Sequence, residues 1–166
     1  MDWVKRVIQR TYQHHLNLSF LECTVDLHTN SEKLMTHIKT YLYPYNPTPL
    51  LKKRGWTVYA WHQPDFEIWE AAAESLKEAN TIALEHGRPG LVKQAGGYLI
   101  IFDMIGTAAI AICPEEKFCV LLGQNEELFS YCAHKTLRQF FTVWSKNAGL
   151  VVIHAAVLLR NNRGVA

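Results

Sequence analysis

Three apolar runs in the second half of the chain follow one another with only a few residues between them. They read YLIIFDM over 98–104, TAAIAIC over 107–113 and KFCVLLG over 117–123. Gly106 marks the first connection, and Pro114-Glu115-Glu116 forms the second. Strand-length apolar runs joined by such tight turns are typical of antiparallel hairpins. The sequence therefore predicts an antiparallel meander, which any fold of this chain must accommodate.

A long amphipathic helix is predicted directly after this meander, over residues 125–147. Asn125 suits the N-cap, acidic residues fill the first turn, and Lys146 stands in the last turn, where these charges are favourable with the helix dipole. Gly149 follows as the natural C-terminal stop. Apolar residues at helical spacing form the expected buried face: Phe129, Ala133, Leu137, Phe140, Phe141 and Trp144.

The first half of the chain predicts a strand, a helix and a second strand. Residues 17–28 alternate between apolar and polar side chains, which favours one strand. Thr29 and Glu32 have the spacing of a capping box at the start of the helix, and the prolines of PYNPTP end it. The stretch WTVYAW is rich in aromatic and β-branched residues and predicts the second strand. One apolar stripe runs along the helix through Leu34, Met35, Ile38, Tyr41 and Leu42.

Two further segments leave alternatives open. Residues 65–85 predict a helix with Asp65 at the N-cap, although TIALEHG at the end of this segment would also form a strand. The residues GRPG at 87–90 predict a turn. The N-terminus fits a short amphipathic helix that either packs on its own domain or lies on a membrane surface. Its apolar residues are Trp3, Val4, Val7, Ile8 and Tyr12. Together these elements predict an α+β fold, an antiparallel or mixed sheet with helices packed on it.

The composition limits the classes of function. The 166 residues suffice for one domain, or for one domain and a piece of another. Nearly half of the residues are apolar, as in soluble globular proteins, and the net charge of +2 is too small to indicate nucleic acid as a partner. No apolar stretch reaches the roughly 18 residues of a transmembrane helix, and no signal peptide is evident. The four cysteines form no C-x-x-C pair, which favours buried free thiols in a reducing cytoplasm: Cys23, Cys113, Cys119 and Cys132.

No complete catalytic signature is present in the sequence. It lacks the phosphate-loop motif G-x-x-x-x-G-K-[ST], the dinucleotide motif G-x-G-x-x-G, the nucleophile elbow G-x-S-x-G and the zinc motif H-E-x-x-H. These 166 residues therefore hold no self-sufficient catalytic motif.

Weaker groups of polar residues each have a simple structural explanation. His14-His15 is expected on the surface at the end of a polar helix, and Cys132-x-His134 has the helical spacing at which two side chains point apart. Cys113 and Cys119 fit apolar packing on neighbouring strands, and Lys52-Lys53-Arg54 fits a solvated turn. Solvent exposure explains the carboxylates at the strand ends, which are Asp103, Glu115 and Glu116.

The last segment, LVVIHAAVLLRNNRGVA over 150–166, combines an apolar run with a turn and the start of a second run. Residues 150–159 predict a strand that is apolar on both faces, Asn161-Asn162 suits a hairpin turn, and a return strand begins near Gly164. His154 stands inside the first run. Burying its imidazole without a hydrogen-bond partner costs about 1–3 kcal/mol. From the residues of this run alone, we interpret His154 as a core histidine whose hydrogen bonds are satisfied.

The segment GLVVIHAAVLLRNNRGVA, from 149 to 166, closely resembles the HPr serine kinase-related proteins, a bacterial family with P-loop phosphotransferase cores. In that family a helix precedes an apolar strand with a His-Ala or His-Gly pair, and a hairpin turn follows. A second strand then runs directly into the phosphate-binding loop. This sequence shows the same order as far as the first residues of the second strand. The stretch LHTNSEKLMTHIKTYLYPY at 27–45 also looks like the segment that precedes the core in the HPr kinase-related branch.

The resemblance implies an ATP- and Mg²⁺-dependent transfer of phosphate to a protein serine or to a small hydroxyl acceptor. Residues 1–148 would be an N-terminal α+β accessory region, and 149–166 would be the first strand hairpin of the P-loop kinase core. In the related phosphoenolpyruvate carboxykinases the matching strand histidine is a metal ligand. The resemblance thus implies that His154 lies near the nucleotide phosphates or the metal. Because the phosphate loop itself is absent, we expect the 166-residue chain alone to be inactive.

Two other functions remain open at this point. A non-catalytic module would bind a peptide or another protein through aromatic residues near Trp56, Tyr59 and Trp61, because such side chains serve both as interface anchors and as core. A small metal-dependent enzyme built on the histidines is the third hypothesis, although no two histidines have ligand spacing on one element. The sequence leaves the phosphate acceptor and the oligomeric state open.

Overall fold

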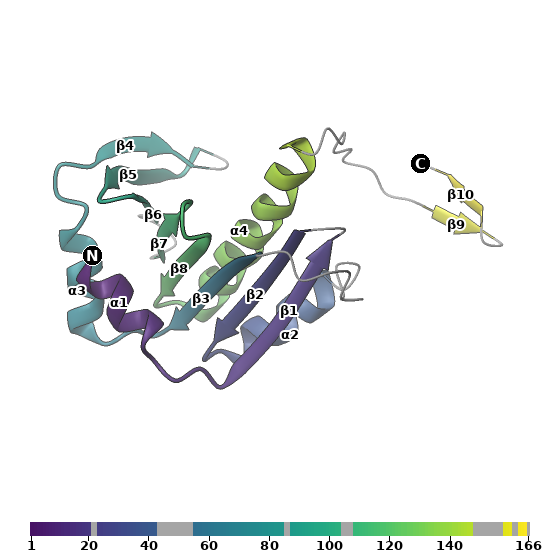
Figure 1. Cartoon of the computed structure of the whole chain (residues 1–166), viewed down its shortest axis with the longest axis horizontal. Helices are drawn as coiled ribbons and strands as arrows, with labels where there is room; N and C mark the ends of the chain where they lie inside the picture. The colour runs from purple at the N-terminus through teal and green to yellow at the C-terminus, as the bar shows by residue number, and fades with distance from the viewer. Residues whose placement is uncertain are drawn as a thin grey trace.

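The computed structural model describes residues 1–20, 23–42, 55–84, 87–103, 108–147, 158–160 and 163–165. They form an α+β structure in which four helices pack on an eight-stranded mixed sheet (Figure 1). The helices are α1 (Asp2–Ile8), α2 (Glu32–Tyr41), α3 (Phe66–Glu74) and α4 (Glu126–Asn147). Of these described helices, none is long and apolar enough to cross a membrane.

The sheet has the strand order β1-β2-β3-β8-β7-β6-β5-β4. The pairs β2·β3 and β3·β8 are parallel, and the other neighbouring pairs are antiparallel. The predicted meander is confirmed as β6·β7·β8, and WTVYAW is confirmed as part of β3. The strands are β1 (His14–Phe20), β2 (Cys23–Thr29), β3 (Trp56–His62), β4 (Asn80–Ala83), β5 (Pro89–Ala95), β6 (Tyr98–Asp103), β7 (Ala108–Cys113) and β8 (Phe118–Gly123).

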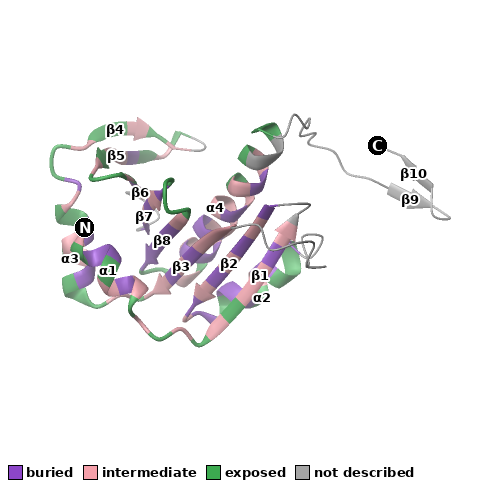
Figure 2. Ribbon diagram, viewed as in Figure 1, coloured by how far each residue is buried: buried purple, intermediate pink, exposed green. Residues whose placement is uncertain are grey.

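The sheet separates two apolar cores, one under each pair of helices. Alternate residues of β3 divide between them: Val58 and Ala60 face α2 and α4, while Tyr59 and Trp61 face α1 and α3. Figure 2 shows that burial follows the central strands and the inner sides of the helices. The first core includes Leu27, Leu34, Ile38, Leu121, Phe129 and Leu137, and the second includes Trp3, Val7, Ile68, Ile100, Val120 and Leu122.

The N-terminal helix packs on its own domain. Its residues Trp3, Val4 and Val7 are fully buried in the second core, so its apolar face is not available to a membrane surface. The four cysteines are confirmed as buried and free. Asn125 is also confirmed as the N-cap of α4, because its side-chain oxygen accepts hydrogen bonds from the backbone N–H groups of Glu127 and Leu128.

The single strand predicted at 17–28 is instead the hairpin β1–β2. Phe20 pairs with Cys23, so two residues connect the strands. These residues are Leu21-Glu22, which contain none of the Gly, Asn or Pro signals of a tight turn. The apolar alternation continues across the connection, and the sequence therefore gave no indication that the chain reverses there.

The start of α2 also differs from the prediction. Thr29 is the last residue of β2, and Ser31 is the N-cap, its Oγ accepting a hydrogen bond of 3.0 Å from the N–H of Leu34. The buried stripe of α2 is confirmed except at Tyr41, a residue that is 61 % exposed. Tyr41 contacts the ring of His134 on α4 and the ring of His37 on its own helix.

The region 65–95 contains a shorter helix and more strand than predicted. Helix α3 ends at Glu74, and the alternative strand in TIALEHG is confirmed as β4. Pro89 and Gly90 of the predicted turn already belong to β5, a strand that the sequence analysis missed. Proline is tolerated at the first position of a strand. Gly90 is required there because a Cβ atom would lie 2.7 Å from the side chain of Leu84.

The C-terminal segment contains a separate two-stranded antiparallel sheet of β9 (Leu158–Arg160) and β10 (Arg163–Val165). Arg163 pairs with Arg160, and Val165 pairs with Leu158. The first part of the predicted strand, including His154, and the predicted turn at Asn161-Asn162 lie outside the described residues.

Candidate functional site

A pocket of about 620 Å³ lies where α2 and α4 meet the segment before β5. Helix α2 contributes Lys33, His37 and Tyr41, which are spaced four residues apart and therefore share one side of the helix. The buried stripe of Leu34 and Ile38 runs beside them. The same amphipathic pattern that packs α2 on the sheet thus also orients a polar stripe towards α4. The pocket is completed by Arg88 and by residues of α4, among them Glu127, Ser130 and Tyr131.

Two histidines from different helices meet beside this pocket. The Nε2 atom of His37 lies 3.1 Å from Nδ1 of His134, and the two rings are tilted edge to face. Tyr41 lies against both rings, with centroids 4.6 Å from His37 and 5.9 Å from His134. The N···N contact requires one ring to donate and the other to accept, so at least one imidazole is neutral.

Burial lowers the pKa of both imidazoles. At His134 the pKa is lowered further by the positive charge that His37, Arg138 and Lys135 would place nearby. Both effects disfavour the imidazolium form. At neutral pH the pair is therefore uncharged, and the cations that lie near His134 are Arg138 and Lys135.

A buried ion pair stands next to the pocket. Asp103 is only 3 % exposed, and its carboxylate lies 3.0 Å from the Nη2 atom of Arg88, whose side chain is 24 % exposed. The guanidinium also lies 5.9 Å from the ring of Tyr131, and the ammonium of Lys135 lies 5.2 Å from the same ring. Asp103 therefore fixes the direction of an arginine that still reaches solvent.

The expectation that Asp103 is solvent-exposed is wrong. Its strand β6 lies inside the sheet, and Asp103 pairs with Gly90 of β5, two residues after Arg88. This register brings the arginine beside the carboxylate, and a buried carboxylate requires such a partner. Glu115 and Glu116 are exposed at the turn before β8, as predicted.

The histidine pair at 14–15 lies on a strand, not at the end of a helix. Successive side chains of a strand point to opposite faces, so His14 and His15 are not placed to share one ion. His15 instead stacks on His28, its neighbour across the hairpin, with ring centroids 4.7 Å apart. Among the described residues, no group of three or more His, Cys, Asp or Glu side chains could hold a metal.

The cysteine candidates are structural in this fold. Cys132 is buried, whereas His134 is half-buried and contacts His37 beside the pocket, so the two do point apart on α4. Cys113 pairs with Phe118 and Cys119 with Ile112, so neither cysteine faces the other directly across the strands. Burial raises the pKa of the Cys23 thiol to about 11, and it raises the pKa of the Cys119 thiol further. Buried thiols of this kind are poor nucleophiles.

The aromatic residues near 56–61 do not form one surface. Trp56 faces the α2/α4 side and stacks on Phe140 at 4.4 Å, whereas Tyr59 and Trp61 face the opposite side and contact Tyr12. All are half-buried in the two cores. The interface expected around Trp56, Tyr59 and Trp61 is therefore divided between two faces of the sheet.

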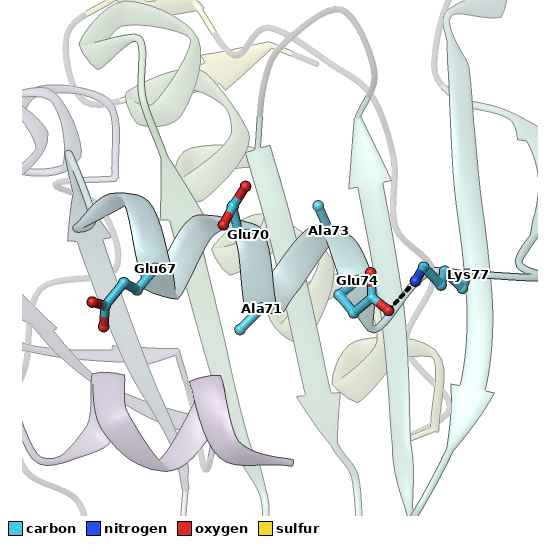
Figure 3. Close-up of a pocket in the computed structure, with 6 residues that line it drawn as sticks. All are labelled: Glu67, Glu70, Ala71, Ala73, Glu74 and Lys77. Atoms are coloured by element: carbon cyan, nitrogen blue, oxygen red, sulfur yellow. Dashed lines mark ion pairs between the residues drawn. The ribbon is translucent and has the colours of Figure 1, made fainter.

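A second hollow, of about 600 Å³, follows the outer side of α3 (Figure 3). It is lined by Glu67, Glu70 and Glu74 with two alanines and Lys77, all from one helix and the turn after it. Lys77 forms an ion pair with Glu74, and Glu67 pairs with Arg6. Such contacts are typical of a solvated helix surface, and the lining residues named here form no catalytic or metal-binding group.

The main features of the α2/α4 pocket were missed by sequence reasoning. His37 and His134 are 97 positions apart, and no local spacing connects them. The signal that the sequence did contain was the Lys33-His37-Tyr41 stripe beside a buried stripe. Lys52-Lys53-Arg54 and His154, two of the predicted candidates, lie outside the described residues. Comparisons with family models, with curated proteins and with solved structures find no match to this chain.

Proposed function

We propose that this chain is the N-terminal part of an ATP-dependent phosphotransferase of the HPr serine kinase-related type. In this proposal residues 1–148 form the accessory α+β region, and 149–166 begin the P-loop core. The proposal rests on the resemblance of GLVVIHAAVLLRNNRGVA to the opening segment of that core. The described residues of this segment, 158–160 and 163–165, form an antiparallel pair of short strands.

That pairing is the observation that supports the proposal. Helix α4 ends at Asn147, and the strands β9 and β10 follow in antiparallel register, with two residues between Arg160 and Arg163. A helix, an apolar run and a tight hairpin in this order are what the resemblance requires. An antiparallel pair joined by two residues places the end of β10 beside the start of β9, at the end of the apolar run.

In the intact enzyme, residues after 166 would supply the phosphate loop. Its backbone amides would cradle the nucleotide phosphates, and its hydroxyl residue would hold Mg²⁺. His154 is proposed to lie near the phosphates or the metal, where a neutral imidazole either ligates the ion or accepts a proton. The acceptor would be a protein serine or a small hydroxyl compound.

The first test is to read the gene beyond codon 166. We expect an in-frame G-x-x-x-x-G-K-[ST] within roughly ten residues, the usual context of that motif after a strand. The 166-residue chain should not hydrolyse Mg-ATP, and the longer product should. In the longer product, His154→Ala should lower kcat, whereas His62→Ala, at the half-buried C-terminal end of β3, should not. A stop codon directly after 166, or ATP turnover by the 166-residue chain, would contradict the proposal.

A second candidate function is a non-catalytic binding module, and the α2/α4 pocket favours it. This alternative predicts that the 166-residue protein is monodisperse and that the amides of 158–165 are protected from hydrogen exchange. The phosphotransferase proposal predicts rapid exchange there, because β9 and β10 would lack the neighbours of the complete core. Hydrogen exchange measured by mass spectrometry distinguishes the two.

A further inference from the structure

We propose that the pocket between α2 and α4 binds the phosphate group of a small phosphorylated molecule. Lys33, Arg88 and the His37–His134 pair would supply the positive charge and the hydrogen-bond donors. The inference depends only on the described α+β unit, and it holds or fails independently of the phosphotransferase proposal.

The charges around the pocket favour an anion over a metal ion. Lys33 and Arg88 line it, and Lys135 and Arg138 stand close enough on α4 to disfavour protonation of His134. Among the described residues that line the pocket, Glu127 is the acidic one, and it is exposed. A positive potential that opposes an imidazolium also opposes a metal cation, and it attracts an anion.

Arg88 is oriented before any ligand arrives. The buried carboxylate of Asp103 lies 3.0 Å from its Nη2 atom, and its Nε atom is buried. A ligand would therefore bind the part of the guanidinium that remains in water, since the side chain is 24 % exposed. A guanidinium fork matches two oxygens of a phosphate, and prior orientation reduces the entropy that binding costs. The partly exposed arginine on a buried carboxylate is therefore suited to recognise an oxyanion.

The histidine pair can adapt to the charge of the ligand. The two imidazoles share one N–H···N contact, and burial lowers the pKa of both, which favours their neutral forms at neutral pH. A phosphate dianion nearby would favour the protonated form, so binding should take up a proton. The charged and titratable groups around the pair come from both helices and from the segment before β5: Lys33 and Tyr41 on α2, Glu127, Tyr131, Lys135 and Arg138 on α4, and Arg88.

The size of the pocket fits a small organic phosphate. Its volume of about 620 Å³ lies within the range of small-molecule sites, about 300–1,000 Å³. Tyr41 lines the pocket and is 61 % exposed although its ring contacts both histidines, so part of the residue is available to the organic part of the ligand. The shared chemistry is the phosphomonoester, which is found in both nucleotides and phosphorylated amino acids or sugars.

The test is calorimetric titration of the 166-residue protein at low salt with inorganic phosphate, O-phosphoserine and AMP, with serine and adenosine as unphosphorylated controls. We expect one saturable site for at least one phosphorylated probe and none for serine or adenosine. Stronger binding of AMP identifies a nucleotide, stronger binding of phosphoserine identifies a phosphorylated amino acid, and equal binding of all three probes locates the recognition in the phosphate alone. Heats measured in buffers of different ionisation enthalpy should show proton uptake on binding.

Substitutions in and near the pocket test whether the phosphate binds there. Arg88→Met should weaken binding about tenfold or more, and Lys33→Met about three- to tenfold, because charge-assisted hydrogen bonds are lost. Lys39→Met, which removes the same charge from an exposed position of α2 outside the pocket, should leave binding unchanged. Glu127→Gln should strengthen binding, because it removes the carboxylate that repels the anion.

Lys33, Lys39 and Glu127 are exposed, so their variants should fold even if Arg88→Met does not. The inference is overturned if no phosphorylated probe binds saturably. It is also overturned if Lys39→Met weakens binding as much as Lys33→Met, because the effect would then be one of net charge. Binding that neither Lys33→Met nor Glu127→Gln alters would place the phosphate elsewhere and would overturn it as well.

Discussion

The helix pairs on the two faces of the sheet are held together by different kinds of polar contact. Between α1 and the start of α3, the contacts are exposed ion pairs: Arg6 with Glu67, and Arg10 with Asp65. Beside α2 and α4, the contacts are a half-buried histidine pair and the buried carboxylate of Asp103 on Arg88. The apolar cores beneath are alike, so the difference lies in how far the charges are removed from water. The α2/α4 side combines this burial with a pocket lined by several elements.

Truncation of one large core side chain on each face should give the largest effect. Phe129 and Trp3 are fully buried in the first and second cores. Phe129→Ala and Trp3→Ala should each lower the free energy of unfolding by about 3–5 kcal/mol, because each leaves a cavity and loses buried apolar area. Chemical denaturation measures both, and equal m-values would show that the two cores unfold together. Strongly unequal losses would mean that the two faces already differ in their apolar packing.

Removal of the buried carboxylate should have the next largest effect. Asp103→Ala leaves the Arg88 guanidinium without its carboxylate partner. We expect the free energy of unfolding to fall by about 3 kcal/mol. This value is near the lower limit for broken buried pairs, because Arg88 is partly hydrated. The double variant Asp103→Ala/Arg88→Met should recover much of the loss, since it removes the uncompensated charge. A loss below 1 kcal/mol in Asp103→Ala would make this pair equivalent to the exposed pairs of the other face.

The histidines should make stability depend on pH, more strongly on the α2/α4 face. The pKa values of His37, His134 and, on the other face, His28 are lowered in the folded state, mainly by burial. Below the unfolded pKa of about 6.5, the unfolded chain therefore binds more protons than the folded chain. The free energy of unfolding should fall as the pH decreases from 6.5 towards the folded pKa values, and these groups should add no pH dependence above that range.

Urea denaturation at pH 7.5 and pH 5.5 measures this dependence. His37→Asn/His134→Asn should reduce the stability difference between the two pH values, because two of the groups with lowered pKa are removed. His28→Asn should reduce it less, because it removes one such group, whose pKa the nearby Asp26 partly restores. An unchanged difference in the double variant would show that the pair does not resist protonation.

Local patterns were sufficient for the elements that depend on local signals. The meander has apolar runs bounded by Gly and Pro, and α4 has an N-cap, terminal charges and a periodic apolar face, so both were predicted correctly. The β1–β2 reversal and β5 were missed, because Leu21-Glu22 carries no turn signal and β5 contains Pro89 with polar residues at its end. Such cases are decided by pairing with distant strands, not by intrinsic preference.

The pocket could not be predicted, because its contacts join distant parts of the chain. Arg88 reaches Asp103 only through the register of β5 on β6, and that register requires knowing that β5 exists. The contact of His37 with His134 requires α2 and α4 to lie on the same face of the sheet. The prediction that Asp103 is exposed failed for the same reason: a charge at a strand end is solvated only if nothing packs against it.

The smallest effect is expected at the exposed ion pairs of the α1/α3 face. Arg6 lies 3.1 Å from Glu67, with 35 % and 80 % of the two side chains exposed, so water screens the attraction. A double-mutant cycle with Arg6→Met and Glu67→Gln should give a coupling energy below about 0.5 kcal/mol, and about 0.5 M NaCl should remove it. A coupling above 1 kcal/mol that persists in salt would show that the α1/α3 contact is also held by charge. Burial would then not be what separates the two faces.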